Sequence, residues 1–193
     1  MSTQFNEAIA LFDEANAADP HTELSNGKEV AKELLYAQRM TQQLEHFEPY
    51  AAEVVKLAVR CQHICRWEIP RDSYEMNRKG YLTWRKDLAK FHAEKAGGIL
   101  ESVGYASDII KEVQALLQKK QLKRNANTQL LEDVICLVFL THYFEKFSKK
   151  YSEDKLIDIL QKTWKKMSSK GHEFALKIPF SESSKSIIAK ALA

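Results

Sequence analysis

Apolar side chains recur at helical spacing along almost the whole chain, and this pattern predicts a series of amphipathic helices. Two of these stretches are apolar around more than half of the helix circumference, namely residues 50–66 and the middle of residues 128–151. We expect both of them inside the core, since a helix that is apolar on most sides is buried. In chain order, the predicted helices cover residues 4–17, 29–46, 50–66, 78–103, 107–122, 128–151, 152–170 and a last short segment from Ser181.

Proline and glycine mark where these helices are expected to begin, bend and end. Asp19-Pro20 and Asn26-Gly27 are predicted to bracket a loop. Helix 50–66 is predicted to end before Pro70, because the residue preceding a proline avoids helical angles. Gly97-Gly98 is expected to kink the fourth helix, and Gly171 to end the seventh.

Composition supports a helical protein of ordinary size. The chain has 193 residues, 45% of them hydrophobic, with only six glycines and four prolines. These numbers predict one all-α domain over residues 1–193, with its core at roughly 29–170. No internal repeat or linker divides the sequence.

Charge and cysteine content restrict the possible partners and compartment. The net charge of +3 remains from 29 basic and 26 acidic residues, which gives little attraction for nucleic acid or anionic membranes. Three cysteines fit no even disulfide framework and are expected to be small core residues in a reducing compartment. The N-terminus has no apolar run of signal-peptide type, and the longest apolar run, VICLVFL, is too short to span a bilayer. We therefore expect a soluble, cytoplasmic protein.

Residues 60–92 contain the densest recognition chemistry of the chain. Arg78, Arg85 and His92 are each seven residues apart and should line one edge of a helix. If the preceding helix packs antiparallel to it, His63 and His92 reach a shared cleft with arginines at its rim. The alternative is that each histidine is a hydrogen-bonded packing residue.

The arginines and tryptophans of this stretch also have two interpretations. Arg66, Arg71 and Trp84 either take part in phosphate binding or form a clamp, in which guanidinium groups stack on aromatic rings and hold the loop to the core. For Arg78 and Arg85 phosphate binding is the favoured interpretation.

Asp133 points to the apolar face of its helix, since Leu130 precedes it by three residues and Leu137 follows by four. A buried carboxylate needs a partner, which a metal, a histidine or an arginine can supply. A structural ion pair with Arg60 or Arg85 is the alternative. Glu132 is a second candidate acid. No nucleotide-binding or dinucleotide-binding fingerprint is present, so no organic cofactor is expected.

Five segments covering much of the chain resemble the domain of unknown function 4202 family. They are ELLYAQRM (33–40), RCQHICRWEIPR (60–71), RKGYLTWRKDLAKFHAEKAG (78–97), QLLEDVICLVFL (129–140) and ILQKTWKKMSSKGHEFAL (159–176).

The order and spacing of His63, His92 and Asp133 are, more distantly, similar to those of HD-domain metal phosphohydrolases. This resemblance implies an HD-like helical core and a divalent transition metal, Mn, Fe, Ni or Zn, which these three residues hold and which activates water against a phosphoester. Ala93 stands where that family has the aspartate of its dyad, so the set suits a single metal.

The resulting expectation is metal-dependent hydrolysis of a nucleotide or another phosphorylated small molecule. Glu132 would act as base or orienter, and the substrate would contact Arg66, Arg71, Arg78, Trp84 and Arg85. The alternative is a non-enzymatic helical module that binds an anionic ligand, a nucleic acid or a protein partner. The sequence does not indicate an oligomeric state.

Overall fold

The computed structural model describes residues 2–193, and 70% of the chain is helical, which confirms the predicted fold class. Besides the helices there is one small two-stranded sheet. No helix among the described residues has both the length and the apolar character needed to cross a bilayer. Cys61, Cys65 and Cys136 are free and buried, as predicted.

The chain divides into two compact units, an N-terminal unit of residues 1–120 and a C-terminal unit of residues 121–193. Each is described here by itself. The single domain expected from the sequence therefore stays a prediction.

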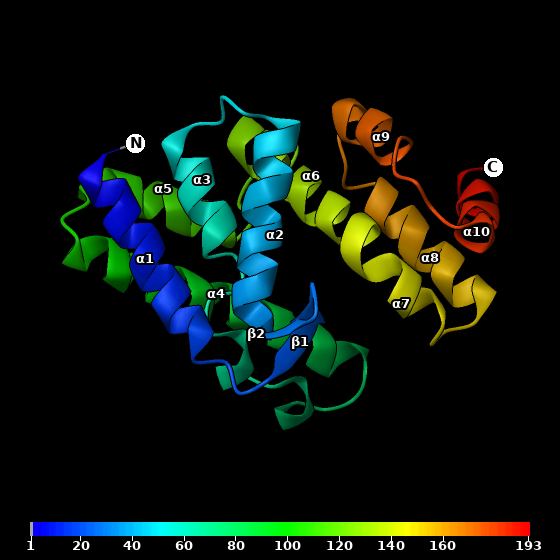
Figure 1. Ribbon diagram of the computed structural model, residues 1–193, viewed down its shortest axis with the longest axis horizontal. Coiled ribbons are helices and arrows are strands. Elements are labelled where there is room, and N and C mark those ends of the chain that lie inside the picture. Colours follow the sequence, from blue (N-terminus) through cyan, green and yellow to red (C-terminus); the bar gives the residue numbers. More distant parts are fainter. Residues whose placement is uncertain (1) are drawn as a thin grey trace. The chain divides into compact units, whose positions relative to one another are not determined.

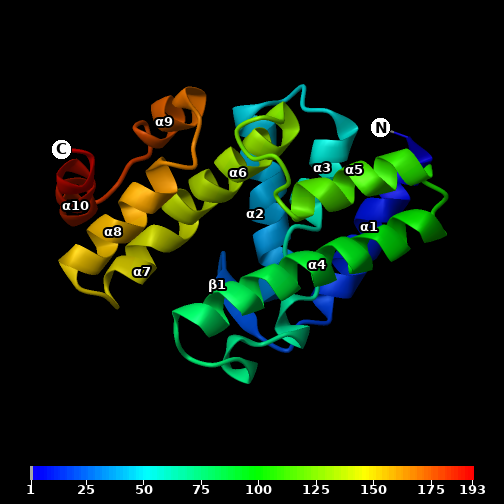
Figure 2. The same cartoon turned by 180° about the vertical axis from the view of Figure 1, so that it is seen from behind.

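The N-terminal unit contains five α-helices among its described residues, together with the hairpin and two short 3-10 turns (Figure 1). Its fully buried side chains come from all parts of the unit and include Phe12, Met40, Leu57 and Leu100. Helices α4 and α5 pack side by side (Figure 2). The elements are α1 (Thr3–Ala17), β1 (Thr22–Ser25), β2 (Lys28–Ala31), α2 (Lys32–Phe47), α3 (Glu53–Arg60), the turns Arg66–Glu68 and Arg71–Ser73, α4 (Arg78–Ser102) and α5 (Ser107–Leu117).

The segment between α1 and α2 is a β-hairpin, where the sequence analysis expected a loop. The two strands are antiparallel, with Thr22 opposite Ala31 and Ser25 opposite Lys28. Asn26 and Gly27 have φ angles of 49° and 76°. Positive φ at both central residues is what a two-residue type I′ turn requires, and Asn-Gly is its preferred sequence.

Helix α3 ends at Arg60, six residues earlier than predicted. Cys65 adopts a left-handed conformation, with φ of 51°. Its backbone N–H donates to Oδ1 of Asn16, a fully buried residue of α1, at 3.0 Å. A hydrogen bond to a distant segment thus replaces the helical continuation that the apolar pattern predicts.

Helix α4 runs unbroken through Gly97-Gly98, and the kink expected there stays a prediction. A Cβ at position 97 would collide with Nε2 of the Gln114 side chain. Gly97 therefore serves the close packing of α5 on α4.

The C-terminal unit begins with α6 (Ala126–Val138), a π-helical turn (Phe139–Tyr143) and α7 (Phe144–Ser148). These three elements occupy the stretch for which one continuous helix was predicted. They are followed by α8 (Glu153–Trp164), α9 (Ser169–Ala175) and α10 (Glu182–Leu192), which packs against α8. Gly171 lies inside α9 and does not end α8, although the sequence analysis predicted that end. Its lack of a Cβ makes room for Asp133, since a Cβ there would lie 2.7 Å from Asp133 Oδ1.

Candidate functional site

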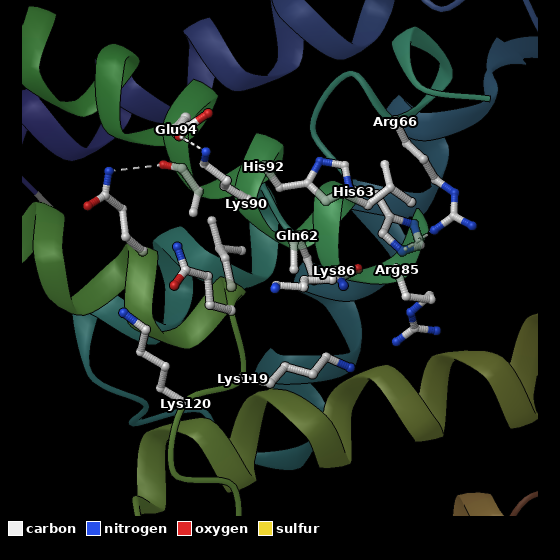
Figure 3. Close-up of a pocket in the computed structure, with 16 residues that line it drawn as sticks. Gln62, His63, Arg66, Arg85, Lys86, Lys90, His92, Glu94, Lys119 and Lys120 are labelled. Atoms are coloured by element: carbon white, nitrogen blue, oxygen red, sulfur yellow. Dashed lines mark hydrogen bonds and ion pairs between the residues drawn. The ribbon is translucent and has the colours of Figure 1, made fainter. Parts of the chain in front are cut away.

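The N-terminal unit contains a cavity of about 750 Å³ between the end of α3, helix α4 and the end of α5 (Figure 3). Its lining is strongly cationic. The charged side chains are six lysines or arginines and a single acid, Glu94, which pairs with Lys90 at 3.6 Å. The six cations are Arg66, Arg85, Lys86, Lys90, Lys119 and Lys120.

Arg66 and Arg85 lie at the same end of the cavity as His63 (Figure 3). The guanidinium carbon of Arg66 is 4.8 Å from the centre of the Trp84 ring. Arg85 donates a long hydrogen bond of 3.4 Å to the hydroxyl of Tyr81. Within residues 2–193, no carboxylate forms an ion pair with either arginine. Burial lowers the pKa of Arg66, and the Glu33 carboxylate partly opposes this shift.

His63 lies in the turn after α3, and its ring stacks on Tyr36 at 4.1 Å. Nε2 is 2.9 Å from Nη1 of Arg66, and Nδ1 is 3.3 Å from Oε2 of Glu33. Because a guanidinium group only donates, Nε2 must be the acceptor and Nδ1 must carry the proton. Burial and the adjacent Arg66 charge hold the pKa of His63 well below its usual value, so the imidazole is neutral.

His92 of α4 is buried, and its ring centre lies 5.9 Å from that of His63. Nδ1 is 2.8 Å from the carbonyl oxygen of Ile64. A carbonyl only accepts, so Nδ1 carries the proton here too, and Nε2 keeps a lone pair with no hydrogen-bond partner in the described part of the chain. Burial, and then the neighbouring His63, lower the pKa of His92 to about 3.

Nδ1 thus carries the proton in both histidines: that of His92 donates to a backbone carbonyl, and that of His63 lies 3.3 Å from the Glu33 carboxylate. Metal-binding histidines are oriented in this way, with Nε2 left for the metal. Nε2 of His92 is open in this sense, whereas Nε2 of His63 already accepts a hydrogen bond from Arg66.

Glu33, in the first turn of α2, is a site residue that the sequence analysis missed. Its side chain is buried beside His63, and burial raises its pKa. Its backbone N–H donates to Oδ2 of Asp19 at 3.1 Å. The signal was present in the sequence, since Ala37 and Met40 follow Glu33 by four and seven residues and place it on the apolar face of its helix.

Asp133, the predicted third metal ligand, belongs to the C-terminal unit and is engaged there. Its carboxylate accepts hydrogen bonds from the backbone N–H of Ser168 at 2.7 Å, from the Ser168 hydroxyl at 2.6 Å and from Nε2 of Gln129 at 3.2 Å. Arg60, one arginine considered as its partner, instead forms a bidentate pair with Asp13.

Among residues 2–193, no three or more His, Cys, Asp or Glu side chains are grouped so that they could hold a metal ion. Glu132 is 2% exposed, and its Oε1 lies 3.7 Å from Nζ of Lys166. The role of Glu132 as base and the three-residue metal set both stay predictions.

Arg71 and Trp84 hold the loop before α4 in place. Arg71 donates to the carbonyl oxygens of Tyr74 and Glu75 at 3.1 and 2.7 Å, and the Trp84 indole N–H donates to the carbonyl of Ile69 at 3.0 Å. These contacts match the clamp interpretation. Neither residue lines the cavity, and neither does Arg78, which is exposed at the start of α4.

A family model for a domain of unknown function (DUF4202) matches residues 6–188. The chain belongs to the DUF4202 family. Comparison with curated proteins and with solved structures gives no match. The DUF4202 match includes every residue that lines the cavity, whereas the likeness to HD-domain hydrolases stays a prediction.

Proposed function

We propose that this DUF4202 protein binds a phosphorylated small molecule in the cavity of its N-terminal unit. The observation that carries the proposal is the charge of the lining. Residues 1–120 contain 16 basic and 18 acidic side chains, so the unit as a whole is slightly acidic. The cavity nevertheless gathers six cations and one paired acid. This local excess of positive charge supports binding of an anionic ligand more directly than the net charge of the chain does.

The end of the cavity formed by Arg66 and Arg85 suits a phosphate group. Guanidinium groups match phosphate oxygens with paired, charge-assisted hydrogen bonds. Lys86 and Lys119 add cations to the same lining (Figure 3).

The rest of the lining suits an uncharged ligand body. Leu88, Ala89 and Leu117 supply apolar surface, and the amides of Gln114 and Gln118 supply hydrogen-bond donors and acceptors. A volume of about 750 Å³ is in the range of small-molecule sites. A nucleotide has both parts, a charged phosphate end and a body with hydrogen-bonding edges.

Calorimetric titration tests this proposal. Pyrophosphate and nucleoside diphosphates should bind the protein, and the unphosphorylated nucleosides should not. Replacement of Arg85 by Gln should weaken binding about 10- to 100-fold, the effect of losing hydrogen bonds to a charged group. Arg78→Gln is the matched control, because it removes an exposed arginine of the same helix outside the cavity. Equal losses in both variants, or no binding at all, would contradict the proposal.

Metal-dependent hydrolysis of the bound ligand is the second candidate function. It is favoured by His92, whose Nδ1–H donates to a backbone carbonyl and whose Nε2 has no hydrogen-bond partner among the described residues. A bound Mn, Fe, Ni or Zn ion would supply an activated water for attack on the phosphoester. Arg66 would have to leave Nε2 of His63 before both imidazoles could hold an ion, and no third protein ligand is gathered beside them in the described residues.

Metal analysis and phosphate release separate binding from hydrolysis. If the protein is a hydrolase, native protein purified without chelator should contain a transition metal, and the His92→Asn variant should not. Phosphate release by the native protein should stop when a chelator is added and return when Mn is supplied. If pyrophosphate binds while neither metal nor phosphate release is detected, the protein is a binding module and the hydrolase proposal is wrong.

A further inference from the structure

A tyrosine ring lies just outside the phosphate end of the cavity. Tyr81 is near the start of α4, and its hydroxyl accepts the 3.4 Å hydrogen bond from Arg85. Arg85 lines the cavity, whereas Tyr81 does not. A ligand whose phosphate group is bound by Arg85 therefore has Tyr81 within reach as well as the cavity lining.

The ring of Tyr81 is held in place and is still accessible. The guanidinium carbon of Arg71 lies over the ring, 6.0 Å from its centre, and the Trp84 ring is tilted against it at 5.9 Å. Arg71 is itself fixed by its hydrogen bonds to backbone carbonyls of the loop before α4. Tyr81 nevertheless remains 43% exposed. A positioned aromatic ring with an accessible surface is what a nucleobase needs for stacking.

We infer that Tyr81 is the stacking platform for a second base, so that the ligand of this site has a nucleoside on each side of its phosphate linkage. The inference rests on the proposed function, since it specifies the phosphorylated small molecule in the cavity. The ligand class is then a dinucleotide, in place of a nucleotide that ends in a phosphate group.

The chemistry of the phosphate linkage accounts for two places that suit an organic group. A terminal phosphate carries one such group, which the apolar and amide lining of the cavity accommodates, and Tyr81 would then contact no part of the ligand. A pyrophosphate linkage carries two such groups, and Arg66 and Arg85 supply one guanidinium group for each of its phosphoryl groups. The second organic group then leaves the cavity at the Arg85 end, beside the Tyr81 ring.

Calorimetric titration of the full-length protein compares two probes that differ in the second base. They are a dinucleoside diphosphate and the matching nucleoside-diphosphate ribose, made with the base of the nucleoside diphosphate that binds best. For adenine, the probes are diadenosine diphosphate and ADP-ribose. Both have the same pyrophosphate linkage and the same charge, so the ratio of their affinities reports the second base. The dinucleoside probe should bind about 5- to 100-fold tighter, the effect of stacking one base on an aromatic side chain.

Three variants assign this preference to the ring. Tyr81→Ala should make the two affinities equal. Tyr81→Phe should retain the preference, because it keeps the ring and loses only the hydroxyl that contacts Arg85. Leu82→Ala is the matched control and should also retain it, since Leu82 is the next residue of α4 and is 57% exposed. The ratio is measured within each variant, so a general change in affinity cancels.

The outcomes distinguish failure of the inference from failure of the proposed function. Equal affinities in the native protein, or a preference that Tyr81→Ala retains, overturn the stacking platform and leave phosphate binding intact. If Tyr81→Phe loses the preference together with Tyr81→Ala, the tyrosine acts through its hydroxyl on Arg85, and the platform is again wrong. If neither probe nor any nucleoside diphosphate binds the native protein, both the inference and the proposed function are wrong.

Discussion

Two buried carboxylates, Glu33 and Asp133, occupy equivalent positions on the apolar faces of their helices and have very different surroundings. Asp133 is 2% exposed and accepts three hydrogen bonds, two from Ser168 and one from Gln129. Glu33 is 5% exposed, and its Oε2 lies 3.3 Å from Nδ1 of His63. The first carboxylate is satisfied by the fold, while the second is beside a ligand-sized cavity.

The comparison shows that the hydrogen-bond and charge partners of a buried carboxylate indicate whether its role is structural or functional. Asp133 ties α6 to the start of α9 and is surrounded closely enough that Gly171 has no room for a Cβ. Glu33 gains little compensation for burial, so its pKa is raised. A group that the fold leaves poorly compensated is the better candidate for a site.

The largest effect is expected for Asp133→Ala, which removes the acceptor of three donors in the C-terminal unit. We expect the free energy of unfolding of that unit to fall by about 3–5 kcal/mol, because hydrogen bonds to a buried charge are lost and donors are left without a partner. Amide hydrogen exchange should locate the loss in residues 121–193. Pyrophosphate affinity should stay unchanged. A variant of native stability that loses bound metal would instead make Asp133 a ligand.

Acid should destabilise the N-terminal unit through its buried neutral histidines. His92 has a pKa lowered from 6.5 to about 3. Its stabilising contribution is fully present above pH 6.5 and is lost as pH falls towards 3, because the unfolded chain binds the proton first. The loss should be on the order of 5 kcal/mol.

The raised pKa of Glu33 opposes this trend, since protonation at low pH relieves its burial. Urea unfolding at several pH values measures the free energy of unfolding, to which both His92 and Glu33 contribute. His92→Asn, whose amide can still donate to Ile64, isolates the histidine: the acid sensitivity should decrease in this variant. An unchanged pH profile would show that His92 is not the sensitive group.

Periodicity was sufficient to predict the helical fold and the buried position of Asp133, because both depend on apolar spacing within one helix. It could not predict where α3 ends, since that depends on a hydrogen bond from Cys65 to Asn16, 49 residues away. The hairpin at Asn26-Gly27 was predictable from its turn chemistry. It was missed because its two strands are too short to show a clear alternation of apolar and polar residues.

For the site too, features within one stretch of sequence were predictable, and contacts between distant segments were not. His63, Arg66, Arg85 and His92 line the cavity, and their density in one stretch was visible in the sequence. Sequence spacing also grouped Arg78 with Arg85, although Arg78 lies at the exposed start of the helix. Glu33 carried the same periodic signal as Asp133 and was missed because its partner, His63, is 30 residues away and meets it only through packing of α2 against α3.

Gly171→Ala tests how closely Asp133 is surrounded. The added Cβ would lie 2.7 Å from Asp133 Oδ1, so the carboxylate or α9 must move, at a cost of about 2 kcal/mol. Gly98→Ala is the matched control, because nothing lies within 4 Å of a Cβ there. The control should gain up to about 1 kcal/mol from helix propensity. Equal effects in thermal unfolding would mean that Asp133 has room to adjust.

Glu33→Gln should have the smallest effect on stability, about 1 kcal/mol or less in either direction. The neutral amide avoids the burial cost of the carboxylate and loses only the contact with His63. The contrast with Asp133→Ala is informative because a structural acid and a site acid differ in what the fold loses without them. If Glu33→Gln destabilises the N-terminal unit by several kcal/mol in urea unfolding, Glu33 is as structural as Asp133. If Glu33→Gln is as stable as the native protein but the tautomer of His63 changes, the Glu33 carboxylate serves the site and not the stability of the fold.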